Sequence, residues 1–166
     1  MATTYDAIQT YTLGAPASSI DFTSIAASWT DLRLILSTTT GGTGALFKLN
    51  NVSTGGLYST TAMKGDGTTA SSATTANMNV TYIGGYSISL GTSPKFTLTT
   101  IDLFSYANTS TYKTILQTLS ADQSGSGGTA RSVSMYRSTS AINQITLYSA
   151  TFGVGTIATL YGIAAI

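Results

Sequence analysis

No side chain after Arg137 carries a charge, and this uncharged stretch limits what the chain can fold into. A membrane-spanning helix needs about 20 consecutive, mostly apolar residues. Polar residues interrupt the stretch every few positions, so we reject a membrane anchor. Apolar side chains instead gather on one side of an extended chain at 145–152 and at 157–163. We therefore expect a pair of strands joined by a turn at 153–155.

The rest of the chain has the same character. Charged residues make up 8% of the 166 residues, against about 25% in an ordinary soluble domain. Ser and Thr supply about a third of the sequence, and the β-branched Thr suits a half-exposed strand better than a helix. We expect an all-β chain that forms one domain over residues 1–166. Cys is absent, so disulfides and thiolate metal sites are excluded.

Strand signals recur at short, even spacing between turn residues. In 30–37, Leu32, Leu34 and Leu36 occupy alternate positions, as in a half-buried strand. Further strands are expected at 5–13, 19–22, 44–50, 56–65, 95–106, 111–121, 131–137, 142–149 and 157–165, with two short runs in 80–90. About ten short strands, with 95–106 as a long central one, predict an antiparallel β-sandwich of the jelly-roll type.

The connections carry their own predictions. The strands at 44–50 and 56–65 are separated by turn-rich residues, so we expect a hairpin. Segments 22–29 and 138–144 could each form a single turn of helix.

Two segments, 66–79 and 122–130, are rich in small polar residues and lack periodicity. We expect both to be surface loops that tolerate insertions.

Side chains that support catalysis are scarce. His and Glu are absent along with Cys, which excludes a Ser-His-Asp triad and an imidazole metal site. Only Asp pairs remain, and we interpret Asp66 as a turn former, Asp122 as the start of a loop and Asp102 as a hydrogen-bond acceptor in the sheet. We predict no enzymatic activity and no cofactor. Calcium requires several acids, and no second acid lies near Asp66 in the sequence, so we favour a turn for the "GDG" loop. Whether this loop binds an ion stays open.

The surface chemistry favours binding at close range. A nearly uncharged surface attracts neither nucleic acid nor anionic lipid over a distance, so we expect neither partner. The chain holds 10 Tyr, and most of them fit the edges of a sandwich. Together with Ser, Thr and Asn, they could also form a binding face that loses little side-chain entropy on ordering.

The uncharged C-terminal stretch supplies more apolar surface than one small core needs, which is typical of an interface. We expect the chain to assemble with itself as a homotrimer through this stretch, which lacks charges to protect a strand edge. Arg131 and Arg137 flank "SVSMY" and should project toward the same face, either solvated or paired with Asp of a neighbouring subunit. The interface candidates are Arg131, Arg137, Tyr148, Ile157, Tyr161 and Ile163.

Six segments, in this order, together resemble small β-rich virion proteins of tailed bacteriophages: "TYDAIQTYTLGAPASSIDFTSI", "TDLRLILS", "KGDG", "SYANTSTYKTIL", "MYRSTSAINQITLYS" and "GTIATLYGI". The resemblance spans nearly the whole chain. It implies a jelly-roll fold on the outside of a phage particle, often as a trimer, and it carries no catalytic residues with it.

Two functions follow from this resemblance. The first is a head decoration or cement protein on the virion surface, which binds the major capsid protein or another virion protein. The alternative is a tail-fibre or spike module that recognises host-surface glycan. Strand signal runs from Tyr5 to Ile163 and leaves no room for an attachment domain or a shaft, which favours the first. The start of the sequence lacks a basic n-region, so we expect synthesis in the host cytoplasm.

Overall fold

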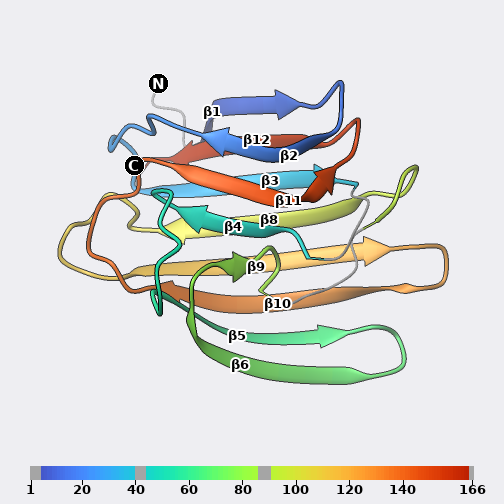
Figure 1. Cartoon of the computed structure of the whole chain (residues 1–166). Coiled ribbons are helices and arrows are strands. Elements are labelled where there is room, and N and C mark those ends of the chain that lie inside the picture. Colours follow the sequence, from blue (N-terminus) through green and yellow to red (C-terminus); the bar gives the residue numbers. More distant parts are fainter. Residues whose placement is uncertain (1–4, 40–43, 86–90, 165–166) are drawn as a thin grey trace.

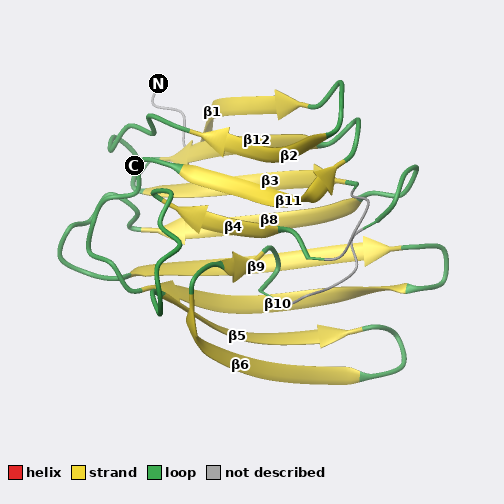
Figure 2. Cartoon of the chain, in the orientation of Figure 1, coloured by secondary structure: helices red, strands yellow, loops and turns green. Residues whose placement is uncertain are grey.

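A computed structural model of the chain describes residues 5–39, 44–85 and 91–164. The described residues form twelve strands in two antiparallel sheets that pack face to face (Figures 1 and 2). This confirms the predicted all-β sandwich, with slightly more strands than the ten expected. The same residues contain no helix long and apolar enough to cross a bilayer.

The large sheet has eight strands and the small sheet has four among the described residues. In spatial order, the large sheet consists of β1 (Tyr5–Thr12), β12 (Ile157–Ile163), β3 (Asp31–Thr38), β8 (Thr97–Phe104), β9 (Lys113–Asp122), β10 (Gly127–Tyr136), β5 (Tyr58–Gly65) and β6 (Ala70–Met78). The small sheet consists of β2 (Ala17–Phe22), β11 (Ile145–Phe152), β4 (Leu46–Leu49) and β7 (Thr81–Tyr82).

Alternation along each strand places the core between the sheets. Leu32, Leu34 and Leu36 of β3 are fully buried, as their spacing predicted. Strand β8 lies between β3 and β9, which confirms the long central strand expected at 95–106. Residues 111–121 are also confirmed as a strand.

The predicted pairing of the two C-terminal strands was wrong. Strand β11 lies between β2 and β4 in the small sheet, and β12 lies between β1 and β3 in the large sheet. Gly153 donates its N–H to the carbonyl of Thr39 at 2.7 Å, where the chain crosses from one sheet to the other. The two strands press apolar side chains into the core from opposite sides. Neither is an edge strand, so the expected need for edge protection does not arise.

The hairpin predicted for 44–50 and 56–65 was also wrong, because its two strands lie in different sheets. Strand β4 belongs to the small sheet and β5 to the large one, so the connection crosses between layers. Asn50 and Asn51, with φ of 51° and 55°, turn the chain at the start of this connection.

The two predicted surface loops contain strand. Residues 70–78 form β6, which pairs with β5, and β10 begins as early as Gly127. A tight turn remains at 123–126, where Gln123 donates its N–H to the carbonyl of Ser126 at 2.7 Å. β6 gave no periodic signal because most of its side chains are exposed on both faces.

The helical turns expected at 22–29 and 138–144 are absent, because backbone bonds to distant residues replace local ones. Ile25 donates its N–H to the carbonyl of Asn143 at 3.0 Å, and Ile142 donates to that of Tyr106 at 2.9 Å. Of the two runs expected in 80–90, the first is β7, and the second, at 86–90, lies outside the described residues.

Candidate functional site

The candidate site is the outer face of the large sheet, which we define as the surface that points away from the small sheet. Strand register aligns its side chains in rows across the sheet. Three neighbouring rows read Ile157, Ser37, Leu98, Ser120, Thr129, Gly65, Ala70; then Thr159, Ile35, Thr100, Thr118, Arg131, Met63, Ser72; then Tyr161, Arg33, Asp102, Leu116, Val133, Thr61, Thr74.

Charges on these rows are few, and two of the three cancel. Arg33 and Asp102 form an ion pair in which the Nη2 of Arg33 donates to Oδ2 of Asp102 at 3.0 Å. This hydrogen bond, with the charge of the carboxylate, raises the pKa of Arg33 although partial burial opposes it. The guanidinium also lies 5.6 Å from the centre of the Tyr5 ring. Arg131 is therefore the unbalanced charge of the three rows.

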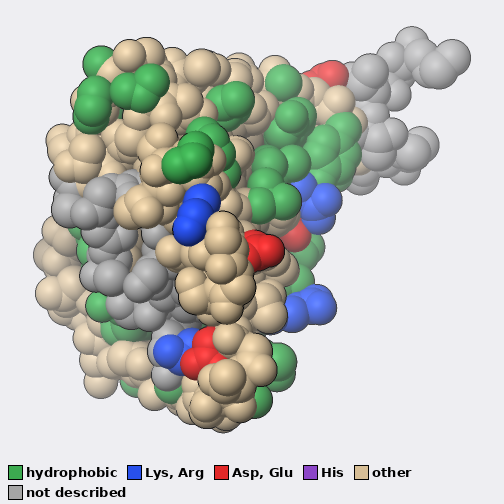
Figure 3. Space-filling model, turned by 90° about the vertical axis from the view of Figure 1, so that its right-hand side faces the viewer, with side chains coloured by type: hydrophobic (Ala, Val, Ile, Leu, Met, Phe, Trp, Pro, Cys, Tyr) green, Lys and Arg blue, Asp and Glu red, His purple; other side chains and the backbone are tan. Residues whose placement is uncertain are grey.

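One part of the outer face, over β12, β3 and β8, is apolar. Leu98 is 54% exposed and Ile157 is 43% exposed. Ile35 and Tyr161 are half-buried beside them. We call these four residues, together with Ile163, the apolar half. Figure 3, which views one end of the sandwich, shows a few charged side chains scattered among hydrophobic side chains and uncharged polar or backbone atoms.

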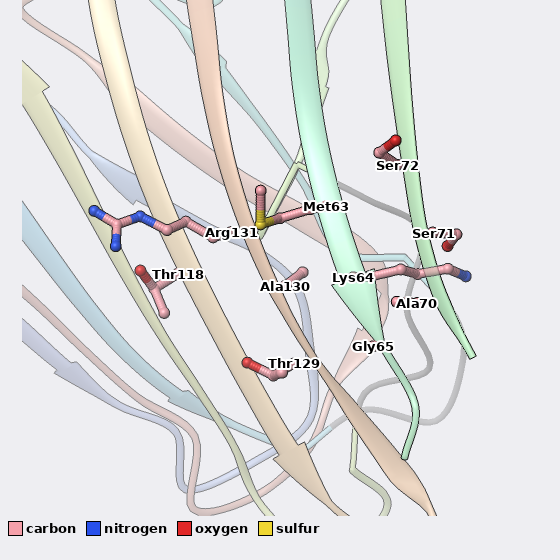
Figure 4. A pocket seen from close by; sticks show the side chains of 10 residues that line it. All are labelled: Met63, Lys64, Gly65, Ala70, Ser71, Ser72, Thr118, Thr129, Ala130 and Arg131. Atoms are coloured by element: carbon pink, nitrogen blue, oxygen red, sulfur yellow. The ribbon is translucent and has the colours of Figure 1, made fainter. Parts of the chain in front are cut away.

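The other part of the outer face, over β10, β5 and β6, is hollowed into a trough with a cavity volume of about 680 Å³. Gly65 and Ala70 form its low floor, because neighbouring positions on two strands there lack bulky side chains. Met63 and Arg131 stand beside it on the adjacent row (Figure 4).

The trough extends at both ends. A hollow that shares Gly65 and Thr129 continues it to the turns that carry Asp66 and Asp122. A further hollow, lined by Tyr112 and Met135 among others, lies along the same strands in the opposite direction. This half of the outer face offers hydroxyl groups together with the exposed apolar side chains of Met63, Val133 and Met135, the cation Arg131 and the exposed ring of Tyr112, and a second cation, Lys64, also lines the trough.

The predicted roles of the Asp residues are confirmed. Oδ1 of Asp66 accepts hydrogen bonds from the Thr68 N–H at 3.0 Å, the Thr68 hydroxyl at 2.8 Å and the Thr69 N–H at 2.7 Å. These bonds lower the pKa of Asp66 to about 2. Asp122 accepts from the Ser124 N–H at 3.0 Å. Within the described ranges, no cluster of three or more acidic side chains could hold a metal.

The six interface candidates do not form one surface. Ile157, Tyr161 and Ile163 share the outer face on β12, and Arg131 lies on the same face beside the trough. Tyr148 lies on the small sheet, where burial raises the pKa of its phenol and the Nζ of Lys48 stands 5.6 Å from its ring centre.

Arg137 lies just past β10 and is engaged within the chain. Its Nη2 donates to the carbonyl of Gly56 and, at 2.9 Å, to Oδ1 of Asn77. These two hydrogen bonds account for the position of the Arg137 side chain without an ion pair to a neighbouring subunit.

The tyrosines only partly follow the prediction of edge positions. Tyr58, Tyr106 and Tyr136 are almost completely buried in the core. Burial raises the pKa of all three phenols, and the Tyr58 hydroxyl accepts a hydrogen bond from the Leu49 N–H at 2.8 Å. Tyr58 of β5 therefore bridges the two sheets through its bond to β4, whereas Tyr106 bonds to the loop residues Ala26 and Trp29.

Sequence reasoning missed Leu98 and Met63 as surface candidates. Alternation in 95–106 had placed Leu98 on the face opposite Ile101, but it could not say which face was buried. Comparison of the chain with protein-family models, curated proteins and solved structures finds no match, so its function has to be argued from the residues and their geometry.

Proposed function

We propose that this protein is a structural protein of a tailed-bacteriophage virion, which decorates the outside of the head shell and stabilises it. The observation that carries the proposal is the outer face of the large sheet, a broad surface of apolar and hydroxyl side chains with few charges. Exposed apolar patches of this kind mark protein–protein contacts. The motif resemblance supplies the virion context.

The strand order supports a jelly-roll framework within the sandwich. In a jelly roll the first, eighth, third and sixth of eight strands form one sheet, and the second, seventh, fourth and fifth form the other. If β5, β6, β9 and β10 are set aside as insertions, the remaining strands follow this order as β1-β12-β3-β8 and β2-β11-β4-β7. Two inserted strand pairs would then have widened one sheet and created the outer face.

In this proposal the apolar half serves assembly. Copies of the chain associate through it about a threefold axis, and the trimer docks on the shell by polar contacts at close range. Few charges have to be desolvated, because Arg33 and Asp102 already neutralise each other.

A second candidate, recognition of host-surface glycan by a tail fibre or spike, is favoured by one observation. Hydroxyls of Ser71, Ser72, Thr118 and Thr129 line the trough among small and apolar residues, with Arg131 beside them and the exposed ring of Tyr112 in the adjoining hollow. Such side chains can hydrogen-bond sugar hydroxyls and stack on a sugar ring.

Quantitative mass spectrometry of purified particles tests the proposal. A copy number on the scale of the major shell protein is expected for a decoration protein. Absence from the particles would overturn both candidates, and only a few copies per particle would favour the tail.

Surface variants identify which half of the outer face is used. Leu98→Lys and Ile157→Lys should abolish rebinding of purified protein to stripped particles, whereas Met63→Lys, on the trough side, serves as the matched control. Loss of glycan binding in Tyr112→Ala with normal rebinding would support the second candidate.

A further inference from the structure

Strand β6 ends the large sheet and is exposed to an unusual degree. Among the described residues no strand pairs with its far edge. Seven of its nine residues are exposed and the other two are half-buried. Ordering a residue costs roughly 1–2 kcal/mol of backbone entropy, and this strand buries little apolar surface in return.

The opposite edge of the same sheet is protected in a way that β6 is not. Strand β1 carries Asp6 and has a register irregularity between Ala7 and Gln9, and both features discourage strand addition. β6 has neither a charge nor a proline; it forms regular pairs with β5 from residue 70 to residue 75, and its own register irregularity lies only at its end, between Thr75 and Met78. The two edges of one sheet therefore differ in their readiness to accept another strand.

The turn between β5 and β6 shows which backbone groups of β6 are free to pair. Asp66 donates its N–H to the carbonyl of Thr69 at 3.2 Å, which makes these two residues a hydrogen-bonded pair. Bonded and non-bonded pairs alternate in an antiparallel ladder. Ser71 and Ala73 therefore bond to β5, while the N–H and C=O groups of Ser72 and Thr74 point away from the sheet.

We propose that β6 pairs antiparallel with β6 of a second copy about a twofold axis near Ser72, within the regular segment 70–75, so that the two large sheets become one continuous sheet. An antiparallel pair of identical strands satisfies the same backbone groups on both sides. It brings no like charges together, because β6 has none, and it sets small side chains (Ser, Thr and Ala) opposite each other.

The pairing would also complete the trough. Ala70, Ser71 and Ser72 of β6 line one side of it. A second copy on the far edge of β6 continues that side into its own trough, so that the two copies share one longer surface. This contact is separate from the apolar half, and it stands whether or not the chain decorates a virion.

Proline at the outward-facing positions tests the proposal. Ser72→Pro removes an N–H that β5 does not use, and proline is tolerated at such positions of an edge strand. We expect sedimentation equilibrium of the full chain at tens of micromolar to give an even number of copies for the wild type. Ser72→Pro should halve the assembled mass.

Two further variants keep the result decisive. Ser72→Lys places like charges close together across the twofold axis and should also halve the mass, which answers the question if Ser72→Pro does not fold. Leu98→Lys, on the apolar half, should leave the β6 contact intact. A wild-type chain that is monomeric or strictly trimeric, or an assembled mass unchanged in both β6 variants, would overturn the proposal.

Discussion

Arg33 and Asp102 face each other across β3 and β8 and form a two-point ion pair near the centre of the outer face. The two side chains are unequally exposed, at 37% for Arg33 and 13% for Asp102. Loss of the arginine leaves a largely buried carboxylate without its cation, whereas loss of the carboxylate leaves an arginine that water can reach.

We therefore expect an asymmetric response to mutation. Arg33→Met should lower the free energy of unfolding by about 1–3 kcal/mol, the usual penalty for a buried unsatisfied group. Asp102→Asn should lower it by less than about 1 kcal/mol, as for exposed ion pairs. Urea unfolding at neutral pH measures both, and a larger loss for Asp102→Asn would contradict the explanation.

The turn at Asp66 should make stability depend on acid pH. The pKa of Asp66 is about 2 in the folded chain and 3.8 without the turn, so the charged form favours folding. Its contribution is fully present above about pH 4 and disappears as the pH falls through 2. Asp66→Asn keeps an oxygen acceptor but removes the charge. Urea unfolding from pH 7 to pH 2 should show less acid sensitivity in this variant, and equal slopes would contradict the prediction.

Lys113 is a buried cation held by backbone carbonyls. Its side chain is fully buried, and its Nζ donates to the carbonyls of Asn108, Thr111 (2.9 Å) and Thr139 (3.3 Å). Lys113→Met leaves these carbonyls without their donor and should lower the free energy of unfolding by about 1–3 kcal/mol. Lys48→Met, on the small sheet, is the control and should lower it by less than about 1 kcal/mol.

The same lysine predicts a second pH effect, in the alkaline range. Burial lowers the pKa of Lys113 below its usual 10.5, so the unfolded chain holds the proton more tightly. Wild-type stability should therefore rise relative to that of Lys113→Met as the pH increases from neutral toward 10. A difference between the two proteins that stays constant over this range, measured by urea unfolding, would show that the folded lysine titrates normally.

Gly162 allows the single tryptophan to lie on β12. A Cβ at this position would clash with the indole of Trp29. Gly162→Ala should destabilise the fold by about 1–3 kcal/mol and change the tryptophan fluorescence, because the ring has to move. At Gly14 a Cβ would meet no atom within 4 Å. Gly14→Ala should therefore leave both stability and fluorescence nearly unchanged, and equal effects of the two variants would refute the role of the contact.

Much of the candidate site depends on packing that no local pattern reports. Alternation in 95–106 separated Leu98 from Ile101, but only the position of the small sheet shows that Leu98 is the exposed one. The hollow at Gly65 arises where the consecutive strands β5 and β6 meet β10, which lies far away in the sequence. The exposed edge of β6 had no signal at all, because a strand exposed on both faces has no apolar period.

The sequence by itself determined that the chain is all-β and where most strands lie. Most strands have one side toward the core, and this requirement imposes a period of two on nearby residues such as Leu32, Leu34 and Leu36. Only the tertiary structure decided which strands are neighbours. The connections that follow β4 and β11 could each have closed a hairpin, yet both cross between the sheets. Burial of Phe152 and Leu160 from opposite sides of one core selects the crossing, and that choice depends on the whole chain.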